Sequence, residues 1–203
     1  MATALHEERI ETVARLAVAC GAKRLLDLGC GSGELLARLA REPRFQRIVG
    51  IDISPQALSA ARDLLGLDQR MDDGRIALLE ASFAQPDERL RGFDAALLVE
   101  TIEHIPPQRL SLVEHAVFAW SRPQTVVITT PNQEYNVLHG MPPGAMRHPG
   151  HCFEWNRRKF RKWATGLAVR NGYSVVFDAI GAADPLLGSS TQLALFGRKP
   201  ACA

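Results

Sequence analysis

A short segment near the middle of the chain carries two acidic side chains and an imidazole. Glu100, Glu103 and His104 stand at positions i, i+3 and i+4, a spacing that places side chains on one face of a helical turn. Two carboxylates and an imidazole suit Mg²⁺ or Mn²⁺ better than a structural zinc ion, which prefers thiolates. The segment is therefore a candidate metal site, although a solvated acid followed by an ordinary helix start would have the same sequence.

A second candidate site is a glycine-rich turn, in which Asp27 precedes Gly29, Gly31 and Gly33 in the pattern D-x-G-x-G-x-G. Glycines let the backbone approach a ligand closely, and a helix that follows offers free N–H groups. Asp52 ends the next apolar segment, where a carboxylate can accept both hydroxyls of an adenosine ribose. The alternative is an NAD-binding fold, whose usual G-x-G-x-x-G spacing is wider.

The combination of Asp27, the G-x-G-x-G turn and Asp52 resembles the class I S-adenosylmethionine (SAM)-dependent methyltransferases. The resemblance implies that SAM is the cofactor, with its methionine part on the glycine turn and its ribose at Asp52. Ser82 would then lie by the adenine, and Val99 near the reactive methyl group. The implied cofactor-binding residues are Asp27, Gly29, Gly31, Gly33, Asp52, Ser82 and Val99.

Two further segments narrow the resemblance. Residues 147–157 read R-H-P-G-H-C-F-E-W-N-R, and residues 130–136 read T-P-N-Q-E-Y-N. Together with Glu100-x-x-Glu103-His104, they resemble the small-RNA 3′-terminal 2′-O-methyltransferases, which are the Hua-enhancer-type enzymes and their bacterial RNA-repair relatives. The similarity runs from about residue 11 to residue 196.

This resemblance implies one bound Mg²⁺ or Mn²⁺. Its implied ligands are Glu100, Glu103, His104 and His151. His148 is a competing histidine, but only His151 directly precedes the x-Phe-Glu-Trp part of the motif. The chain departs from the family at Gly150, where an acid is usual, and at Asn156, where threonine is common. Losing the acid would remove a partner that orients the imidazole and would weaken metal binding.

The implied reaction is transfer of the SAM methyl group to the 2′-hydroxyl of the 3′-terminal nucleotide of an RNA, which protects the end. A divalent ion that binds the 2′ and 3′ oxygens acts as a Lewis acid and as a template, which explains selectivity for a terminal ribose. His104 or His151 would be the catalytic residue that takes the proton, and the sequence leaves open which one. The implied substrate-binding residues are Thr130, Asn132, Arg147 and Phe153.

Aromatic and basic residues near these motifs could contact a single-stranded RNA 3′ end. Tyr135, Phe153 and Trp155 could stack on bases, and the basic run 157–162 could meet phosphates. Each has an ordinary alternative, because hydrophobic positions usually belong to the core and a basic run usually forms a solvated face. The resemblance also implies a protein partner, an RNA end-healing kinase–phosphatase–ligase.

A regular alternation of strands and helices positions these residues. Apolar segments predict strands at 23–28, 47–52, 76–80, 93–99, 125–129, 173–178 and 192–196. Periodicity and capping residues predict helices at 5–20, 34–41, 107–120 and 156–171, and another that starts at Pro55. This pattern predicts an α/β fold with a doubly wound, seven-stranded, mostly parallel sheet, in one domain over 1–203 with its core at about 11–198. Segment 131–153 is a long loop, which is usually functional or disordered.

Composition limits the class of protein. Of 203 residues, 46% are apolar and 23% are charged, as in ordinary globular proteins. No stretch approaches the roughly 18 apolar residues of a membrane span. The net charge of +2 leaves only a local basic patch for nucleic acid. Four scattered cysteines (20, 30, 152 and 202), without a C-x-x-C pair, favour reduced thiols in a cytoplasmic protein.

Two other functions fit part of the sequence. A metal-independent SAM methyltransferase for a small molecule would keep the glycine turn without using the glutamate and histidine set. A module that binds RNA ends and SAM without catalysis would keep both. Metal dependence of methyl transfer separates the first from the main hypothesis, and turnover separates the second. The chain could be an isolated catalytic domain or a short stand-alone form.

Overall fold

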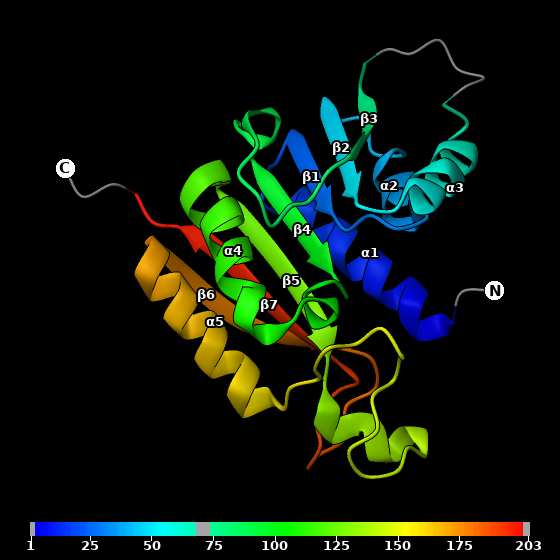
Figure 1. Ribbon diagram of the computed structural model, residues 1–203, viewed down its shortest axis with the longest axis vertical. Coiled ribbons are helices and arrows are strands. Elements are labelled where there is room, and N and C mark those ends of the chain that lie inside the picture. Colours follow the sequence, from blue (N-terminus) through cyan, green and yellow to red (C-terminus); the bar gives the residue numbers. More distant parts are fainter. Residues whose placement is uncertain (1–2, 68–73, 201–203) are drawn as a thin grey trace.

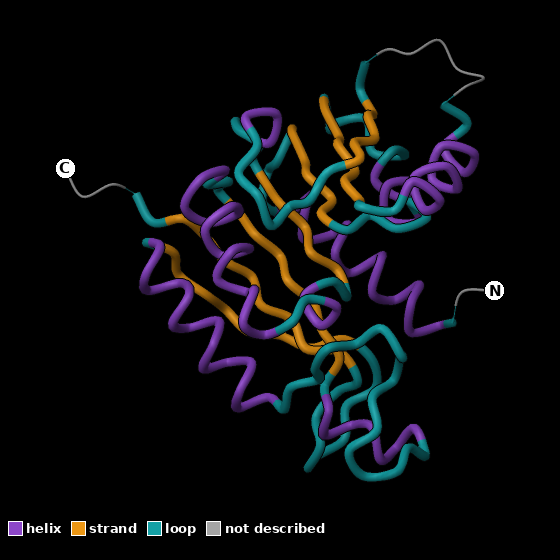
Figure 2. Tube along the Cα trace, viewed as in Figure 1, coloured by secondary structure: helices purple, strands orange, loops and turns teal. Residues whose placement is uncertain are grey.

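Seven strands form one sheet in the order β3-β2-β1-β4-β5-β7-β6 (Figures 1 and 2). The computed structural model describes residues 3–67 and 74–200. The strands are β1 (Arg24–Leu28), β2 (Arg47–Asp52), β3 (Ile76–Glu80), β4 (Ala95–Val99), β5 (Thr125–Pro131), β6 (Tyr173–Ile180) and β7 (Thr191–Arg198). The first five pair in parallel, and β7 is antiparallel to both of its neighbours. The predicted fold class is confirmed.

Helices cover both faces of the sheet. They are α1 (Ala4–Ala19), α2 (Glu34–Leu39), α3 (Pro55–Leu65), α4 (Leu110–Val113) and α5 (Arg157–Asn171). Neighbouring strand residues alternate between two cores, as pleating requires: Leu25 and Leu97 pack with α1 to α3, whereas Leu26 and Leu98 pack with α4 and α5. The predicted caps hold α3 in place, since the Ser54 hydroxyl accepts from the Ala57 N–H and Pro55 starts the helix.

The chain order of the strands reverses between β1 and β4, and ligands of such sheets bind at the carboxyl ends of the strands beside this point. Segment 131–156 and the connection between β6 and β7 fold together beyond the carboxyl end of β5 (Figure 1). Asn132 ties them, because its amide donates to the carbonyls of Leu187 (2.8 Å) and Ser189 (2.9 Å). Both segments therefore stand where the candidate site is expected.

Two predicted elements differ in detail. The helix expected over 107–120 is a succession of a 3₁₀ turn (Pro107–Arg109), α4 and a π-helix (Glu114–Ser121). The spacing of apolar residues in one sequence does not distinguish these helix types, because their hydrogen bonds differ in span by only one residue. The long loop at 131–153 contains a 3₁₀ helix, Gln133–His139, and its side chains hold many of the polar contacts described below.

Two simpler expectations concern the cysteines and membranes. Cys20, Cys30 and Cys152 are free thiols, and Cys202 lies outside the described residues. Among the helices that the structure describes, none is both long and apolar enough to cross a bilayer.

Gly33, directly before α2, offers a test of how tightly the glycine turn packs. Its φ is +86°, and an added Cβ would lie 2.8 Å from the Ala61 Cβ of α3. Gly172 is a matched control, with a φ of +75° and open space around the same position. Gly172→Ala should lower the free energy of unfolding by about 1 kcal/mol for the left-handed backbone. Gly33→Ala should lower it by a further 1–3 kcal/mol, roughly, because of overpacking. Urea unfolding followed by circular dichroism measures both, and equal losses would contradict the close packing.

Candidate active site

A cavity of about 470 Å³ lies at the carboxyl ends of β1, β2 and β4. Of the residues expected to bind the cofactor, it is lined by Gly29, Gly31, Asp52 and Ser82. Glu100 and His104 line the same cavity. The glycine turn and two members of the expected metal set therefore share one space.

The backbone of the glycine turn holds Asp52, the acid at the end of β2. The Gly31 N–H donates to Asp52 Oδ2 (3.0 Å), and the Ser54 N–H donates to Oδ1 (2.9 Å). Gly29 has a φ of +81° and packs so closely on Thr101 that a Cβ would lie 2.6 Å from its methyl group. The turn is thus fixed on both sides, which orients the Asp52 carboxylate toward the cavity that it lines.

Three expected cofactor residues do not line this cavity. Asp27 is buried, and its Oδ2 has no hydrogen-bond partner among the described residues. Burial, with a smaller contribution from the Asp52 charge, raises the pKa of Asp27 to about 7. Gly33 backs onto Ala61 of α3, and Val99 packs against the core beneath α1 to α3. Sequence reasoning missed lining residues that directly follow Ser82 and His104: Phe83, Ala84, Ile105 and Pro106.

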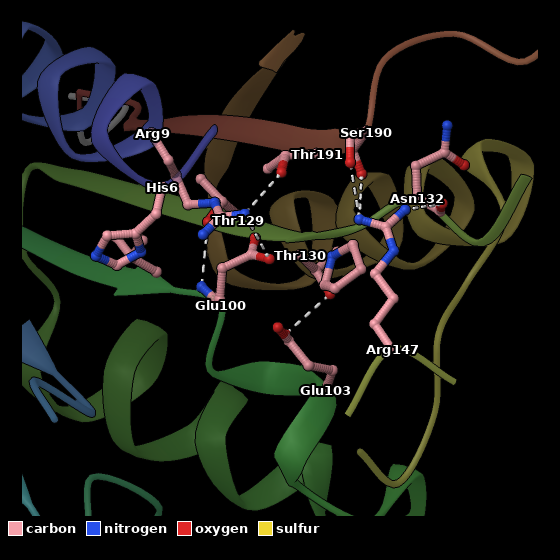
Figure 3. A network of polar contacts seen from close by, with 12 residues as sticks. His6, Arg9, Glu100, Glu103, Thr129, Thr130, Asn132, Arg147, Ser190 and Thr191 are labelled. Carbon is pink, nitrogen blue, oxygen red and sulfur yellow. Dashed lines mark hydrogen bonds and ion pairs between the residues drawn. The ribbon is translucent and has the colours of Figure 1, made fainter. Parts of the chain in front are cut away.

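Two carboxylates belong to one network of polar contacts (Figure 3): Glu103 is buried, and Glu100 is half-buried where it lines the cavity. Glu103 is completely buried; its Oε2 accepts from the Thr130 hydroxyl (3.0 Å), and its Oε1 has no partner among the described residues. Glu100 Oε2 lies 3.2 Å from the Arg9 guanidinium, while its Oε1 is buried without a partner as well. Burial raises the pKa of both acids, and the Glu100 charge raises that of Glu103 further. A cation here would relieve both costs.

The prediction that Glu100, Glu103 and His104 share one face of a helix was wrong. Glu100 does not belong to a helix: it has a φ of +50° at the end of β4, and the 3₁₀ turn that follows covers Ile102–His104. The left-handed backbone costs about 1–2 kcal/mol for a residue other than glycine. It is supported by the Glu100 N–H, which donates to Thr129, and such strain is typical of functional sites.

Three histidines form a second group, with candidate ligand atoms within 4.8 Å of one another: His104, His148 and His151. Among the described residues, this group includes neither Glu100 nor Glu103. His104 Nδ1 lies 3.1 Å from the Gly150 carbonyl, and His151 Nδ1 lies 2.6 Å from Glu154 Oε1. Because these oxygens accept, each Nδ1 donates and each Nε2 keeps a lone pair. His148 is set the other way, since its Nδ1 accepts from the Gly150 N–H. Burial, then the nearby His151 ring, lowers the pKa of His104.

Glu154 supplies the acidic partner that Gly150 cannot. The expected loss of an orienting partner for His151 is therefore wrong. Glu154 Oε1 also accepts from the Arg147 N–H (2.6 Å), and its Oε2 accepts from the Asn136 amide (2.6 Å). Burial acts to raise the pKa of Glu154, but the hydrogen bonds from Asn136, Arg147 and His151 lower it. The signal was present in the sequence, because Glu154 lies three residues after His151 in the quoted motif.

The residues expected to bind substrate are Thr130, Asn132, Arg147 and Phe153, and the structure gives each a contact inside the protein. The Arg147 guanidinium donates to the carbonyls of Asn132 (2.7 Å) and Ser190 (3.0 Å). Phe153 stacks on Trp155, with 4.2 Å between ring centroids. Their contact with substrate stays a prediction. Arg9 had no sequence signal, because only the tertiary fold brings α1 to Glu100.

Three features define a class I methyltransferase domain: the strand order, the glycine turn and Asp52 at the end of β2. The cofactor of this class is SAM. A family model described as a methyltransferase domain matches residues 26–126. A small RNA 2′-O-methyltransferase of Xenopus tropicalis is 34% identical over 203 residues, which cover 96% of this chain and 55% of the relative.

A solved structure matches over nearly the whole length of both chains. The methyltransferase domain of bacterial CtHen1 is 39% identical, with a TM-score of 0.86, over 95% of this chain and 99% of that domain. The chain belongs to the family of small-RNA 2′-O-methyltransferase domains. It spans about half the length of the curated relatives it matches. A Pnkp1/Rnl/Hen1 RNA repair complex also matches, with a TM-score of 0.72 at 21% identity over 97% of this chain and 42% of that one; at this identity only the fold is shared.

Asp27→Asn tests the buried carboxyl of the cofactor site. The folded pKa of about 7 exceeds the usual value of roughly 3.9, so between these pH values the folded state holds a proton that the unfolded state releases. The parent should therefore lose stability as pH rises from 5 to 8. The asparagine side chain does not titrate, so the variant does not lose this stability. The free energy of unfolding of the variant minus that of the parent should therefore rise with pH, by about 1.4 kcal/mol per pH unit at most.

Urea unfolding of SAM-free protein at several pH values measures this difference. Asp63→Asn, at an exposed position on α3, is the control and should show no such trend. A difference between Asp27→Asn and the parent that stays constant with pH would contradict the raised pKa.

Proposed function

We propose that this chain is a catalytic domain that transfers the methyl group of SAM to the 2′-hydroxyl of the 3′-terminal nucleotide of an RNA, with one bound Mg²⁺ or Mn²⁺. One observation carries the proposal. Glu100 and His104 line the cofactor cavity, and buried carboxylate oxygens of Glu100 and Glu103 beside it have no partner among the described residues.

The residues present fit a divalent ion. Glu100, Glu103, His104 and His151 would hold it, and two of their four side chains are acids whose burial favours a cation. When bound, the ion would act as a Lewis acid and template for the 2′ and 3′ oxygens of the last ribose. Oxygen and imidazole donors of this kind match Mg²⁺ or Mn²⁺ rather than a soft metal.

The protein side chains orient the reacting groups. Glu154 and the Gly150 carbonyl hold the rings of His151 and His104 so that each offers a basic Nε2. One of the two Nε2 atoms would take the 2′ proton in place of binding the ion, because a single lone pair cannot do both. The new C–O bond forms as the sulfur–methyl bond breaks, and S-adenosylhomocysteine leaves. The glycine turn and Asp52 fix SAM so that the methyl group can lie in line with the incoming oxygen.

The partners and setting of the reaction are part of the same proposal. RNA is the substrate class that the family supports. An RNA end-healing kinase–phosphatase–ligase partner, cytoplasmic location and a single-domain organisation stay predictions.

Matched RNAs test the proposal. Oligonucleotides that end in a 2′,3′-diol, a 3′-phosphate or a 2′-deoxyribose are incubated with methyl-labelled SAM, with Mn²⁺ or with EDTA. The diol should accept the methyl group in Mn²⁺, and a 3′-phosphate should reduce transfer by roughly 10²–10³-fold, as expected when a stabilising contact in the transition state is lost. The 2′-deoxy end should accept none, because it has no acceptor oxygen.

Other outcomes separate the competing functions. Equal transfer in EDTA would exclude the metal and favour a metal-independent methyltransferase. RNA binding without turnover under every condition would favour a module that only binds RNA ends.

Glu154→Gln tests how His151 is oriented. The amide keeps the shape of the side chain but loses the charge that pairs with the imidazole N–H. Loss of such a partner usually costs 10–100-fold in metal affinity, so Mn²⁺ titration calorimetry should show binding weakened by roughly 10-fold or more. Glu134→Gln is the matched control: it makes the same change in the same loop, where Glu134 pairs with Arg157 and not with a histidine. If both variants bind Mn²⁺ like the parent, Glu154 has no such role.

A further inference from the structure

Helix α5 starts with an unusual concentration of positive charge. Its 15 residues include six basic side chains and no acidic one, and five of the six lie in the first six positions: Arg157, Arg158, Lys159, Arg161 and Lys162. Cations at a helix N-terminus oppose the helix dipole, and like charges at i, i+4 repel. These repulsions destabilise the folded helix, so the stability of the fold does not explain why the charges lie there.

Most of these charges are not neutralised within the protein. Arg157 pairs with Glu134 and donates to the Leu186 carbonyl. In the part of the chain that the structure describes, the other four form no ion pair with a carboxylate. Lys159 lies over the Trp155 ring (5.2 Å to its centroid) and Arg161 over the Phe177 ring (5.5 Å). The aromatic rings hold two cations in place while their charge stays available.

The surface beneath these side chains is hollowed. A cavity of about 240 Å³ lies between α5 and the start of β7, and Arg157 and Arg161 line it together with Asn132. A second, more open hollow shares residues with it and is lined by Arg157, Arg158 and Arg161 with Glu134. Two residues therefore border both hollows, which adjoin along the first two turns of α5.

This basic surface adjoins the candidate active site. Asn132 borders the first hollow, and its carbonyl accepts from Arg147, whose N–H binds the Glu154 carboxylate. Arg158 lies seven positions after His151, so at most about 25 Å of chain lies between them. At 3.4 Å per stacked nucleotide, this corresponds to roughly seven nucleotides.

We propose that the first two turns of α5 and the adjoining hollows form a track for the phosphate backbone of the substrate RNA, upstream of the nucleotide whose 3′ end enters the active site. This inference rests on the proposed function and locates its substrate. A flexible single strand suits such a track, because basic grooves bind its backbone without reading its sequence.

Charge reversal at two positions tests the track. Arg158→Glu with Lys162→Glu changes two exposed side chains, and Lys23→Glu with Arg41→Glu makes the same change in net charge at exposed positions elsewhere. Binding of a fluorescent 12-nucleotide RNA is measured by anisotropy from 50 to 300 mM salt. We expect the α5 variant to bind at least tenfold more weakly at 50 mM salt. The slope of log K against log[salt] should be shallower by about 1.4, or 0.7 per lost phosphate contact in a single strand.

Length dependence and stability complete the test. Relative to the parent, kcat/KM of the α5 variant should fall at least fivefold more on the 12-nucleotide RNA than on a trinucleotide with the same 3′ end. Its Tm should not fall, because glutamates near a helix N-terminus are favourable. Equal effects of the two double variants on RNA binding, or equal losses on both RNA lengths, would overturn the track. Failure of the proposed function is a different result, namely no methyl transfer by the parent to any RNA.

Discussion

The candidate site depends on the burial of two like-charged side chains next to each other. Glu103 is completely buried, Glu100 lies close enough to raise its pKa, and each has an oxygen without a partner among the described residues. Desolvation and like charge both disfavour the ionised pair. Arg9 contacts Glu100 and offsets part of the cost there, with a smaller effect on Glu103. The remaining cost at Glu103 is left to be balanced by a cation or a proton. The surrounding segments position groups that can complete this balance.

The supporting contacts come from segments far apart in the chain. The Thr130 hydroxyl after β5 donates to Glu103, Arg9 of α1 pairs with Glu100, and Glu154 before α5 fixes the His151 ring. Hydrogen bonds and ion pairs between buried groups rigidify the segments that make them. Segment 131–156 is therefore ordered by polar contacts although it contains little regular structure. Glu154 and the Gly150 carbonyl turn the rings of His151 and His104 so that Nε2 of each is available, which helix periodicity alone could not do.

Sequence patterns predicted the parts that depend on local chemistry. Buried parallel strands are continuous apolar runs, so six of the seven expected strands begin within one residue of the observed start. Glycine spacing located the cofactor turn, and Ser54 with Pro55 located α3. The left-handed backbone at Glu100 was not predictable, because it depends on how β4 meets Thr129 of β5. Arg9 acts through a contact made only in the folded chain, whereas Glu154 stands three residues after His151 in the quoted motif. The helix-face argument predicted that Glu100 and His104 lie close together. They do line one cavity, but Glu100 lies outside any helix.

Three features that oppose folding occur at the same edge of the sheet, where the carboxyl ends of β4 and β5 lie. They are the left-handed Glu100, the buried acid pair and the cationic start of α5. Arg122 also has a positive φ (+48°), but it ends a helix, where a left-handed residue is usual and needs no functional explanation. Sequences tend to be consistent with their folds except where function requires otherwise. The acid pair favours a cation, and the start of α5 favours an anion. A metal-bound ribose at the end of a polyanionic strand would satisfy both, which neither a small neutral substrate nor a simple solvated surface does.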